Sequence, residues 1–284
     1  METKQVQASG AIVYWTCGPT DASKLHARFT GLGLGNCSKK ERPKPSALEQ
    51  ALKEYAEERM NSQMRRDGHD KILQRRKQPS KNGFELVDVE RGDERNSYST
   101  DFGCKVDNFG NLTFSDGFPD EDRVSQLFQY HQQYLTGAMV GSCLVKVMRT
   151  LLGVCMRQNG GLYWLPESSL GMWDLVANAV EECSDNSANK VTRIRTVFDS
   201  QAASAVKDAI VEEVVSESQR IADEVAKGEG GQKALERKIK LLTDLENKAT
   251  HYERILGEAL TNVKSVVQQV QHDATIALMQ AAPA

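Results

Sequence analysis

The sequence predicts an α+β protein that ends in a long antiparallel helical hairpin. Three observations predict this class: β-branched and aromatic segments separated by turn residues in the first 118 residues, amphipathic helical patterns in the middle, and an apolar heptad pattern that begins at Leu235. The chain has 284 residues, of which 39% are hydrophobic and 26% charged, and a formal net charge of −3. These values are typical of a soluble globular protein and exclude a polycation made for nucleic acid along its whole length.

The first predicted domain covers residues 1–118 and contains a small antiparallel sheet. Its first segment, residues 10–16, is β-branched and aromatic, as expected of a buried strand. A polar and basic segment, residues 38–81, follows. Four further strands are predicted, separated by turn residues such as those of Asn82-Gly83 and Asn108-Phe109-Gly110-Asn111. They cover residues 71–77, 83–90, 97–106 and 111–115.

The second predicted region, residues 119–198, is mostly helical. Asp120 and Glu121 suit the N-terminus of a helix, where negative charge meets the positive end of the helix dipole. The remaining elements of this region are a helix over 139–157, a short strand over 162–166, a helix to about residue 182 and a strand over 190–198.

The third predicted domain, residues 199–284, is a coiled-coil hairpin. A helix to about residue 227, a tight Gly-rich reversal and a second helix over about 232–279 follow one another. The second helix would be roughly 70 Å long at 1.5 Å per residue. Because the first helix is about 20 residues shorter, we expect the far end of the second to be covered by another part of the protein, a second copy or a partner.

This unequal hairpin motivates the leading functional hypothesis, a non-enzymatic adaptor or assembly component that oligomerises or docks a protein partner. Apolar residues spaced every 3.5 positions keep one seam of a helix facing another helix. The predicted partner-binding residues share that seam. They are Leu235, Leu242, Leu245, Tyr252, Leu256, Val263, Val266 and Val270.

The basic segment supports an alternative hypothesis, a nucleic-acid-binding accessory factor that uses the hairpin to dimerise. Residues 38–81 contain thirteen Lys or Arg and seven Asp or Glu, a local net charge of +6. Such a patch could bind phosphate backbones, although an exposed helix face and hairpin would have the same composition. The tightest basic clusters are Arg65, Arg66, Arg75, Arg76 and Lys77.

Two aromatic residues carry a further alternative. Tyr163 and Trp164 lie in the predicted strand 162–166 and would normally fill the core. If they were exposed, they would instead form an interface that binds a partner.

No sequence motif indicates catalysis, a metal site or a cofactor. The histidines lack metal-ligand spacing, and none of the six cysteines belongs to a CxxC pair. No stretch of eighteen apolar residues occurs, so no membrane span is expected. We expect a cytoplasmic protein that is not an enzyme and that keeps its cysteines reduced.

The segment Gly-Gly-Leu-Tyr-Trp-Leu-Pro at residues 160–166, together with the long C-terminal helices, resembles a group of uncharacterised bacterial and phage proteins. In that group a G-G-x-aromatic-x-hydrophobic-Pro segment precedes a helix, and some members are encoded near MoxR-type AAA+ ATPases. The resemblance implies an accessory role, with an AAA+ ATPase as a possible partner, and it carries over no catalytic residue.

Overall fold

A computed structural model describes residues 9–59, 69–75, 83–90, 97–157, 160–197, 199–228 and 231–281. The chain forms two compact units. Unit 1 comprises residues 1–16, 144–178 and 190–284, and unit 2 comprises residues 17–143 and 179–189. Unit 2 is therefore inserted into unit 1. The predicted domain boundaries after residues 118 and 198 differ from this division, because the N-terminal strand pairs with strands from far along the chain.

Unit 1 is built on an antiparallel sheet with the strand order β10-β1-β9-β8. Strand β1 is central: Ile12 lies opposite Ile194 of β10 on one side and Trp164 of β9 on the other. The strands predicted at residues 10–16, 162–166 and 190–198 are thereby confirmed. The bounds are Ser9–Thr16 for β1, Val154–Cys155 for β8, Tyr163–Pro166 for β9 and Lys190–Val197 for β10.

Helices cover both faces of this sheet. On one face, the Trp15 ring stacks on Tyr163 with 5.1 Å between centroids and lies 6.0 Å from Trp173 of α6 (Glu167–Glu182). Neighbouring side chains along a strand point to opposite faces. Trp164 accordingly lies on the other face, 5.7 Å from Tyr252 of the C-terminal helices, with which it shares a buried core.

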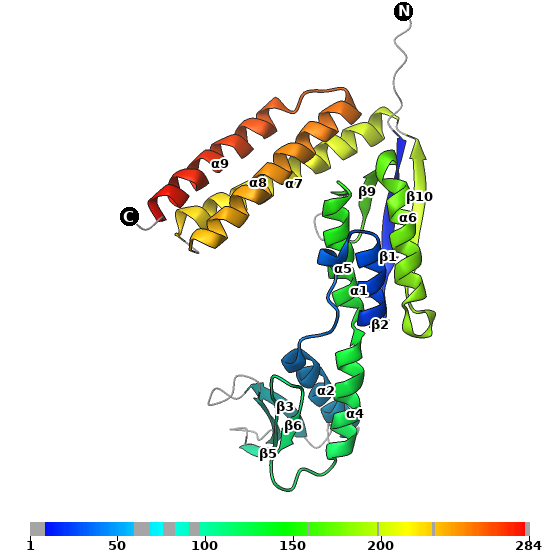
Figure 1. The fold of residues 1–284 in the computed structure, drawn as a ribbon, viewed down its shortest axis with the longest axis vertical. Coiled ribbons are helices and arrows are strands. Elements are labelled where there is room, and N and C mark those ends of the chain that lie inside the picture. The colour runs from blue at the N-terminus through cyan, green and yellow to red at the C-terminus, as the bar shows by residue number, and fades with distance from the viewer. Residues whose placement is uncertain are drawn as a thin grey trace, which may run out of the picture. The chain divides into compact units, whose positions relative to one another are not determined.

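The C-terminal helices form a three-helix bundle, in which the helices lie side by side (Figure 1). They are α7 (Ser200–Ala226), α8 (Gln232–Leu256) and α9 (Thr261–Ala281). The predicted continuous helix over 232–279 is therefore wrong. Gly257 adopts a left-handed backbone conformation, with φ of 66°, and ends α8. Helix α9 then folds back along α7 and α8, so the bundle itself covers the residues that the hairpin would have left over.

The turn between α8 and α9 is held by one carboxylate. Glu253 Oε1 accepts a hydrogen bond from the Leu260 backbone N–H at 2.8 Å, and Oε2 lies 3.1 Å from Lys264 Nζ. The hydrogen bond from Leu260 and the Lys264 charge lower the pKa of Glu253. The chain reversal thus uses a residue from each side of Gly257.

Unit 2 contains the predicted small antiparallel sheet, with the order β3-β4-β5-β6. The strands are β3 (His69–Arg75), β4 (Gly83–Glu90), β5 (Ser97–Val106) and β6 (Leu112–Phe114). Helices α2 (Lys44–Arg59) and α4 (Glu121–Gln133) pack together beside the sheet (Figure 1). Leu52 and Tyr55 of α2, Phe84 of β4 and Phe128 of α4 belong to one buried core.

A second part of unit 2 is held by a buried asparagine. Asn189 accepts a hydrogen bond from the Gly18 backbone N–H and donates to Thr20 Oγ1 and to the Val180 carbonyl, each at 2.8 Å. This part contains the short elements of the unit and α1, whose N-terminus is capped by Asp21. Its elements are β2 (Thr20–Asp21), α1 (Ala22–Gly31), η1 (Gly35–Cys37), β7 (Tyr134–Leu135) and η2 (Asp185–Ser187).

Helix α5 (Gly137–Thr150) is shorter than the predicted helix over 139–157. Leu152 adopts a left-handed conformation, with φ of 60°, and the chain then enters strand β8. Helices α5 and α6 each contribute residues to both units. None of the helices in the described ranges combines the length and apolar character needed to cross a membrane.

Candidate functional site

The predicted partner-binding seam lies inside the three-helix bundle. Leu256 is half-buried, and Val266 is 36% exposed. The other six seam side chains are buried against the chain itself, so a partner could reach them only if the bundle opened. They are Leu235, Leu242, Leu245, Tyr252, Val263 and Val270.

The two candidate interface aromatics are core residues. Tyr163 is 8% exposed and Trp164 is 1% exposed. Tyr163 stacks on Trp15 and Trp164 packs against Tyr252, on opposite faces of the unit 1 sheet. The alternative in which these rings form an exposed interface is therefore corrected: alternation along β9 directs each ring into one of the two helical layers.

The candidate nucleic-acid-binding residues fall almost entirely outside the described residues. This holds for Arg65, Arg66, Arg76 and Lys77, whereas Arg75 is the last residue of β3 and only its backbone is described. The nucleic-acid interface stays a prediction.

One edge of the unit 1 sheet carries exposed apolar side chains. Strand β10 is an edge strand, and among the described strands only β1 pairs with it. Ile194 is 51% exposed, and Tyr14 of β1 is 39% exposed on the same face. The opposite face of β10 is held to α6 by ion pairs of Arg193 with Asp174 and of Arg195 with Glu167. Strand β10 therefore has one face anchored to α6 and one accessible face, on which Ile194 lies between Thr192 and Thr196.

A pocket of about 710 Å³ is the second feature of unit 1 that could receive another molecule. Four parts of unit 1 form its wall: the end of α5 with the turn after it, strands β8 and β9 with Gly160, the middle of α7, and the middle of α8. A volume of this size lies within the range of small-molecule sites, about 300–1,000 Å³. None of these segments alone could form the cavity.

A buried ion pair lies in the wall of this pocket. Lys248 of α8 is 5% exposed, and its Nζ donates hydrogen bonds to Glu213 Oε1 of α7 at 2.5 Å and to the Gly153 carbonyl at 2.7 Å. Burial lowers the pKa of Lys248, and the Glu213 charge opposes that shift. One turn further along α8, Tyr252 donates to the Leu152 carbonyl at 2.7 Å. These contacts join α7 and α8 to the turn that follows α5.

Tyr163 and Cys155 lie side by side in the pocket wall, as cross-strand neighbours of β9 and β8. Burial, followed by the electrostatic interaction with Cys155 and their hydrogen bond, raises the pKa of Tyr163 to about 12. The phenol is protonated near neutral pH, as an ordinary tyrosine is, and the raised pKa extends that state to more alkaline pH. Within the ranges that the structure describes, no group of three or more His, Cys, Asp or Glu side chains could hold a metal ion.

Sequence reasoning missed the residues that meet in the pocket. Glu213, Gly153 and Lys248 are distant in sequence, and only the fold brings them together. One signal was present: Lys248 and Tyr252 are four residues apart and therefore share a helix face. A lysine beside an apolar seam usually packs its aliphatic stem on the seam and keeps its ammonium group in water, so that signal alone would not have identified a buried ion pair.

Residues 10–283, nearly the whole chain, match the family described as "Family of unknown function (DUF6744)". The chain belongs to the DUF6744 family. The matched residues include both units, so the family model covers unit 2 as well as the C-terminal bundle. Comparison with curated proteins and with solved structures gave no significant match.

Proposed function

We propose that this chain is a non-enzymatic interaction protein that docks an extended segment of a protein partner on the edge of the unit 1 sheet. The observation that carries the proposal is that β10 lies at the edge of the sheet and has an exposed apolar side chain. Among the described strands, this edge strand pairs only with β1. More than half of the Ile194 surface is exposed to solvent. The outer edge of a terminal strand presents backbone N–H and C=O groups with which another strand can pair.

The side chains around this edge favour an extended peptide over a helix. Ile194 lies directly opposite Ile12 and diagonally across from Tyr14, so this face of the β1–β10 pair carries three apolar side chains in strand register. A bound strand would place every second side chain over this face, while backbone hydrogen bonds supply the pairing. Arg193 and Arg195 are held by α6 on the opposite face and keep the strand in place.

In this proposal the three-helix bundle does not contact the partner. It holds the sheet in position. Its seam residues are buried in the chain, whereas Ile12 packs against the bundle core and so holds the accessible face of the sheet in position. The first partner to test is a MoxR-type AAA+ ATPase, because of the resemblance of residues 160–166. We also propose that the protein is cytoplasmic, and its six free cysteines, which a reducing compartment would keep reduced, support this.

The test compares tagged full-length Ile194→Lys with tagged full-length Leu175→Lys. Leu175 of α6 is 50% exposed, so both variants add one charge in place of an exposed apolar side chain of the same unit. We expect Ile194→Lys to abolish binding of a purified AAA+ partner or of a prey recovered reproducibly from native cells. Leu175→Lys should retain it. Equal binding by the two variants would exclude β10 as the docking edge.

Salt separates this proposal from the nucleic-acid alternative. Docking through backbone pairing and apolar contact should persist at about 0.5 M salt, whereas phosphate contacts weaken steeply as the logarithm of salt concentration rises. Replacement of Arg65, Arg66, Arg75, Arg76 and Lys77 by Glu should leave partner docking intact. If the parent chain binds duplex DNA or RNA at low salt and this variant does not, the alternative replaces the docking proposal.

A further inference from the structure

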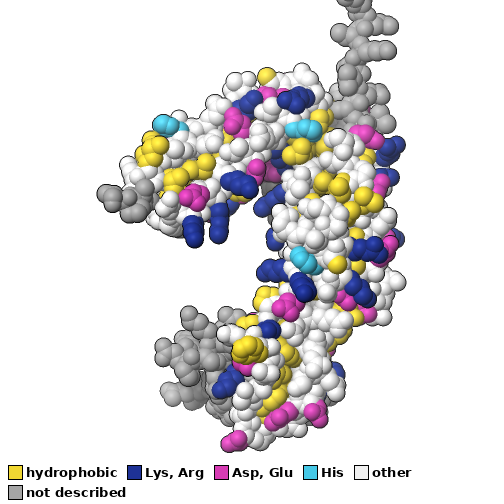
Figure 2. Space-filling view, viewed as in Figure 1, with side chains coloured by type: hydrophobic (Ala, Val, Ile, Leu, Met, Phe, Trp, Pro, Cys, Tyr) yellow, Lys and Arg dark blue, Asp and Glu magenta, His cyan; other side chains and the backbone are white. Residues whose placement is uncertain are grey.

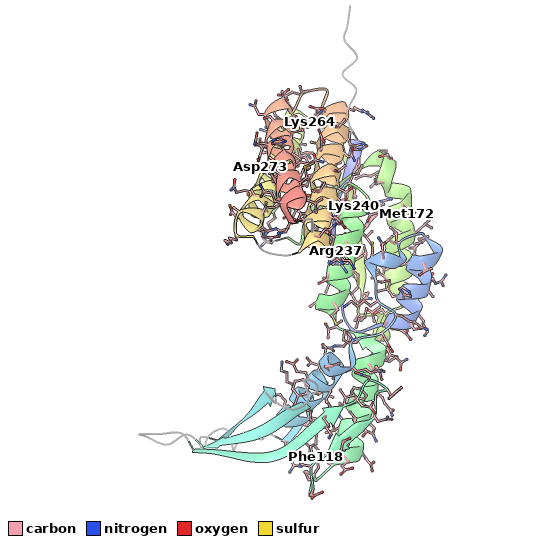
Figure 3. All side chains as sticks on the ribbon, turned by 60° about the vertical axis from the view of Figure 1, so that its left-hand side comes forward. Phe118, Met172, Arg237, Lys240, Lys264 and Asp273 are labelled. Carbon is pink, nitrogen blue, oxygen red and sulfur yellow. The ribbon has the colours of Figure 1, made fainter. Side chains whose placement is uncertain are left out.

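The lining of the unit 1 pocket combines an apolar floor with cations near its surface. The apolar part is formed by side chains from α5, the turn after it, and α8: Val145, Met148, Leu152, Leu241 and Leu245. Arg149 of α5 and Lys240 of α8 line the same pocket and are exposed. Figure 3 shows Lys240 and Arg237, which are three residues apart on α8 and therefore lie on the same side of that helix.

Only some of the charged side chains in the pocket lining form ion pairs. Glu213 is paired with Lys248, and Glu217 is paired with Arg220 of its own helix. Within the described part of the chain, neither Arg149 nor Lys240 makes an ion pair, and neither does Asp244. Two unpaired cations and one unpaired carboxylate thus remain at the pocket. Figure 2 shows further Lys and Arg side chains along one side of the bundle.

The Arg149 charge acts throughout the pocket. It contributes to lowering the pKa of Glu217, after the larger effect of the Arg220 hydrogen bond, and to lowering the pKa of Lys248, after burial. It also opposes the rise in the pKa of Tyr163. Three groups from three walls therefore feel one exposed guanidinium. The lining as a whole carries as many carboxylates (Glu213, Glu217 and Asp244) as cations (Arg149, Lys240 and Lys248), so an anion would bind at the two unpaired cations and not through a net positive charge.

We propose that this pocket binds a small amphipathic anion, a molecule with an apolar or aromatic body and one carboxylate, sulfonate or phosphate group. The body would lie against Met148, Leu152 and Leu241. The anionic group would lie between Arg149 and Lys240, where a guanidinium can donate two hydrogen bonds to two oxygens of one group. This site is separate from the β10 edge and does not depend on the docking proposal.

A pair of fluorescent probes tests the proposal. 8-Anilinonaphthalene-1-sulfonate carries an aromatic body and a sulfonate, whereas N-phenyl-1-naphthylamine has a similar body without charge. We expect the full-length protein to bind the sulfonate probe saturably and about tenfold more tightly than the neutral one. Equal affinities, or no saturable binding of the sulfonate probe, would overturn the proposal.

Variants then test whether Arg149 and Lys240 bind the anionic group of the probe. Arg149→Gln with Lys240→Gln should weaken binding of the sulfonate probe about tenfold and leave the neutral probe unchanged. Arg254→Gln with Lys190→Gln removes two exposed cations outside the pocket lining and should change neither affinity. Arg149→Lys keeps the charge and should retain most of the binding, which separates loss of a cation from loss of folding. Unchanged affinity in the Arg149→Gln, Lys240→Gln variant would refute the assignment.

Protection of one thiol locates the probe. Cys155 lines the pocket and is half-buried, whereas Cys17 belongs to unit 2. Saturating sulfonate probe should slow alkylation of Cys155 by N-ethylmaleimide and leave the rate at Cys17 unchanged, as measured by peptide mass spectrometry. An unaltered rate at Cys155 would place the probe elsewhere and contradict the proposal.

Discussion

Lys248 Nζ of α8 lies 2.5 Å from Glu213 Oε1 of α7, and the same ammonium donates to the Gly153 carbonyl at 2.7 Å. One buried cation therefore connects two helices of the bundle to the turn that leads into strand β8. Removing one partner of a buried pair leaves the other charge without compensation, which costs more than the pair contributes when intact.

Replacement of Lys248 by Met should therefore lower the free energy of unfolding by about 3–5 kcal/mol, because Glu213 would keep a partly buried charge. Urea unfolding followed by circular dichroism measures the change. Lys264→Met, which removes a more exposed ion pair with Glu253, should cost at most about 1 kcal/mol. Similar losses in the two variants would show that burial of the Lys248 pair is energetically unimportant.

The same lysine predicts a pH dependence of stability. Burial lowers the pKa of Lys248 in the folded protein, so the unfolded chain binds more protons at pH values between the folded and unfolded pKa. The contribution of Lys248 to the free energy of unfolding should be complete above the unfolded pKa, near 10.4, and be lost as pH falls through the folded pKa. Urea midpoints of the parent and Lys248→Met at several pH values from 7.5 to 10 measure it. The difference between them should grow with pH, and a constant difference would contradict the lowered pKa.

Gly257 predicts a substitution effect that depends on backbone conformation alone. A Cβ at this position would meet no atom within 4 Å, but the left-handed backbone disfavours any L side chain. Gly257→Ala should destabilise the protein by roughly 1 kcal/mol. Gly171, inside α6, also has open space around its Cβ position and has no positive φ. Gly171→Ala should stabilise the protein by about 0.5–1 kcal/mol, since alanine favours helix interiors. Thermal unfolding should show the two opposite signs.

Because the seam is buried within the chain, substitutions in it should lower the free energy of unfolding. The coiled-coil hypothesis predicted instead that they would abolish association with a partner. Leu242 is fully buried, so Leu242→Ala should cost about 2–5 kcal/mol. Val266, with 36% exposure in the same seam pattern, should cost less than about 1 kcal/mol when changed to Ala. Denaturant midpoints and sedimentation velocity together check this. Dissociation of an assembly in Leu242→Ala, without loss of stability, would restore the seam as an interface.

Local signals were sufficient for most individual elements. The turn residues before the strand at 83–90 and the negative charge of Asp120 and Glu121 at the start of α4 are local signals, and both elements occur where they were predicted. The break at Gly257 was not recoverable, because the apolar period continues through it. A helix that folds back on its neighbour buries the same seam positions as one that continues into a coiled coil. One glycine inside a helical pattern does not separate the two arrangements.

The candidate sites depended on long-range contacts and were harder to predict. The exposure of Ile194 follows from the position of β10 at the sheet edge, which is set by pairing with β1 at the opposite end of the sequence. The pocket requires the turn after α5 to meet α8. Aromatic composition indicated that Tyr163 and Trp164 were large apolar anchors, but their burial follows from the two helical layers around β9.

The central position of β1 has a consequence for biosynthesis. This strand is synthesised before unit 2, whereas its partners β9 and β10 follow the unit 2 sheet and helices α2 and α4. During that interval the nascent chain carries an apolar strand, including Ala11, Ile12 and Val13, with neither neighbour available. Unit 2 can build its α2, α4 and sheet core meanwhile. The sheet of unit 1 therefore forms after that core, and only a chain translated beyond Val197, the last residue of β10, can complete it.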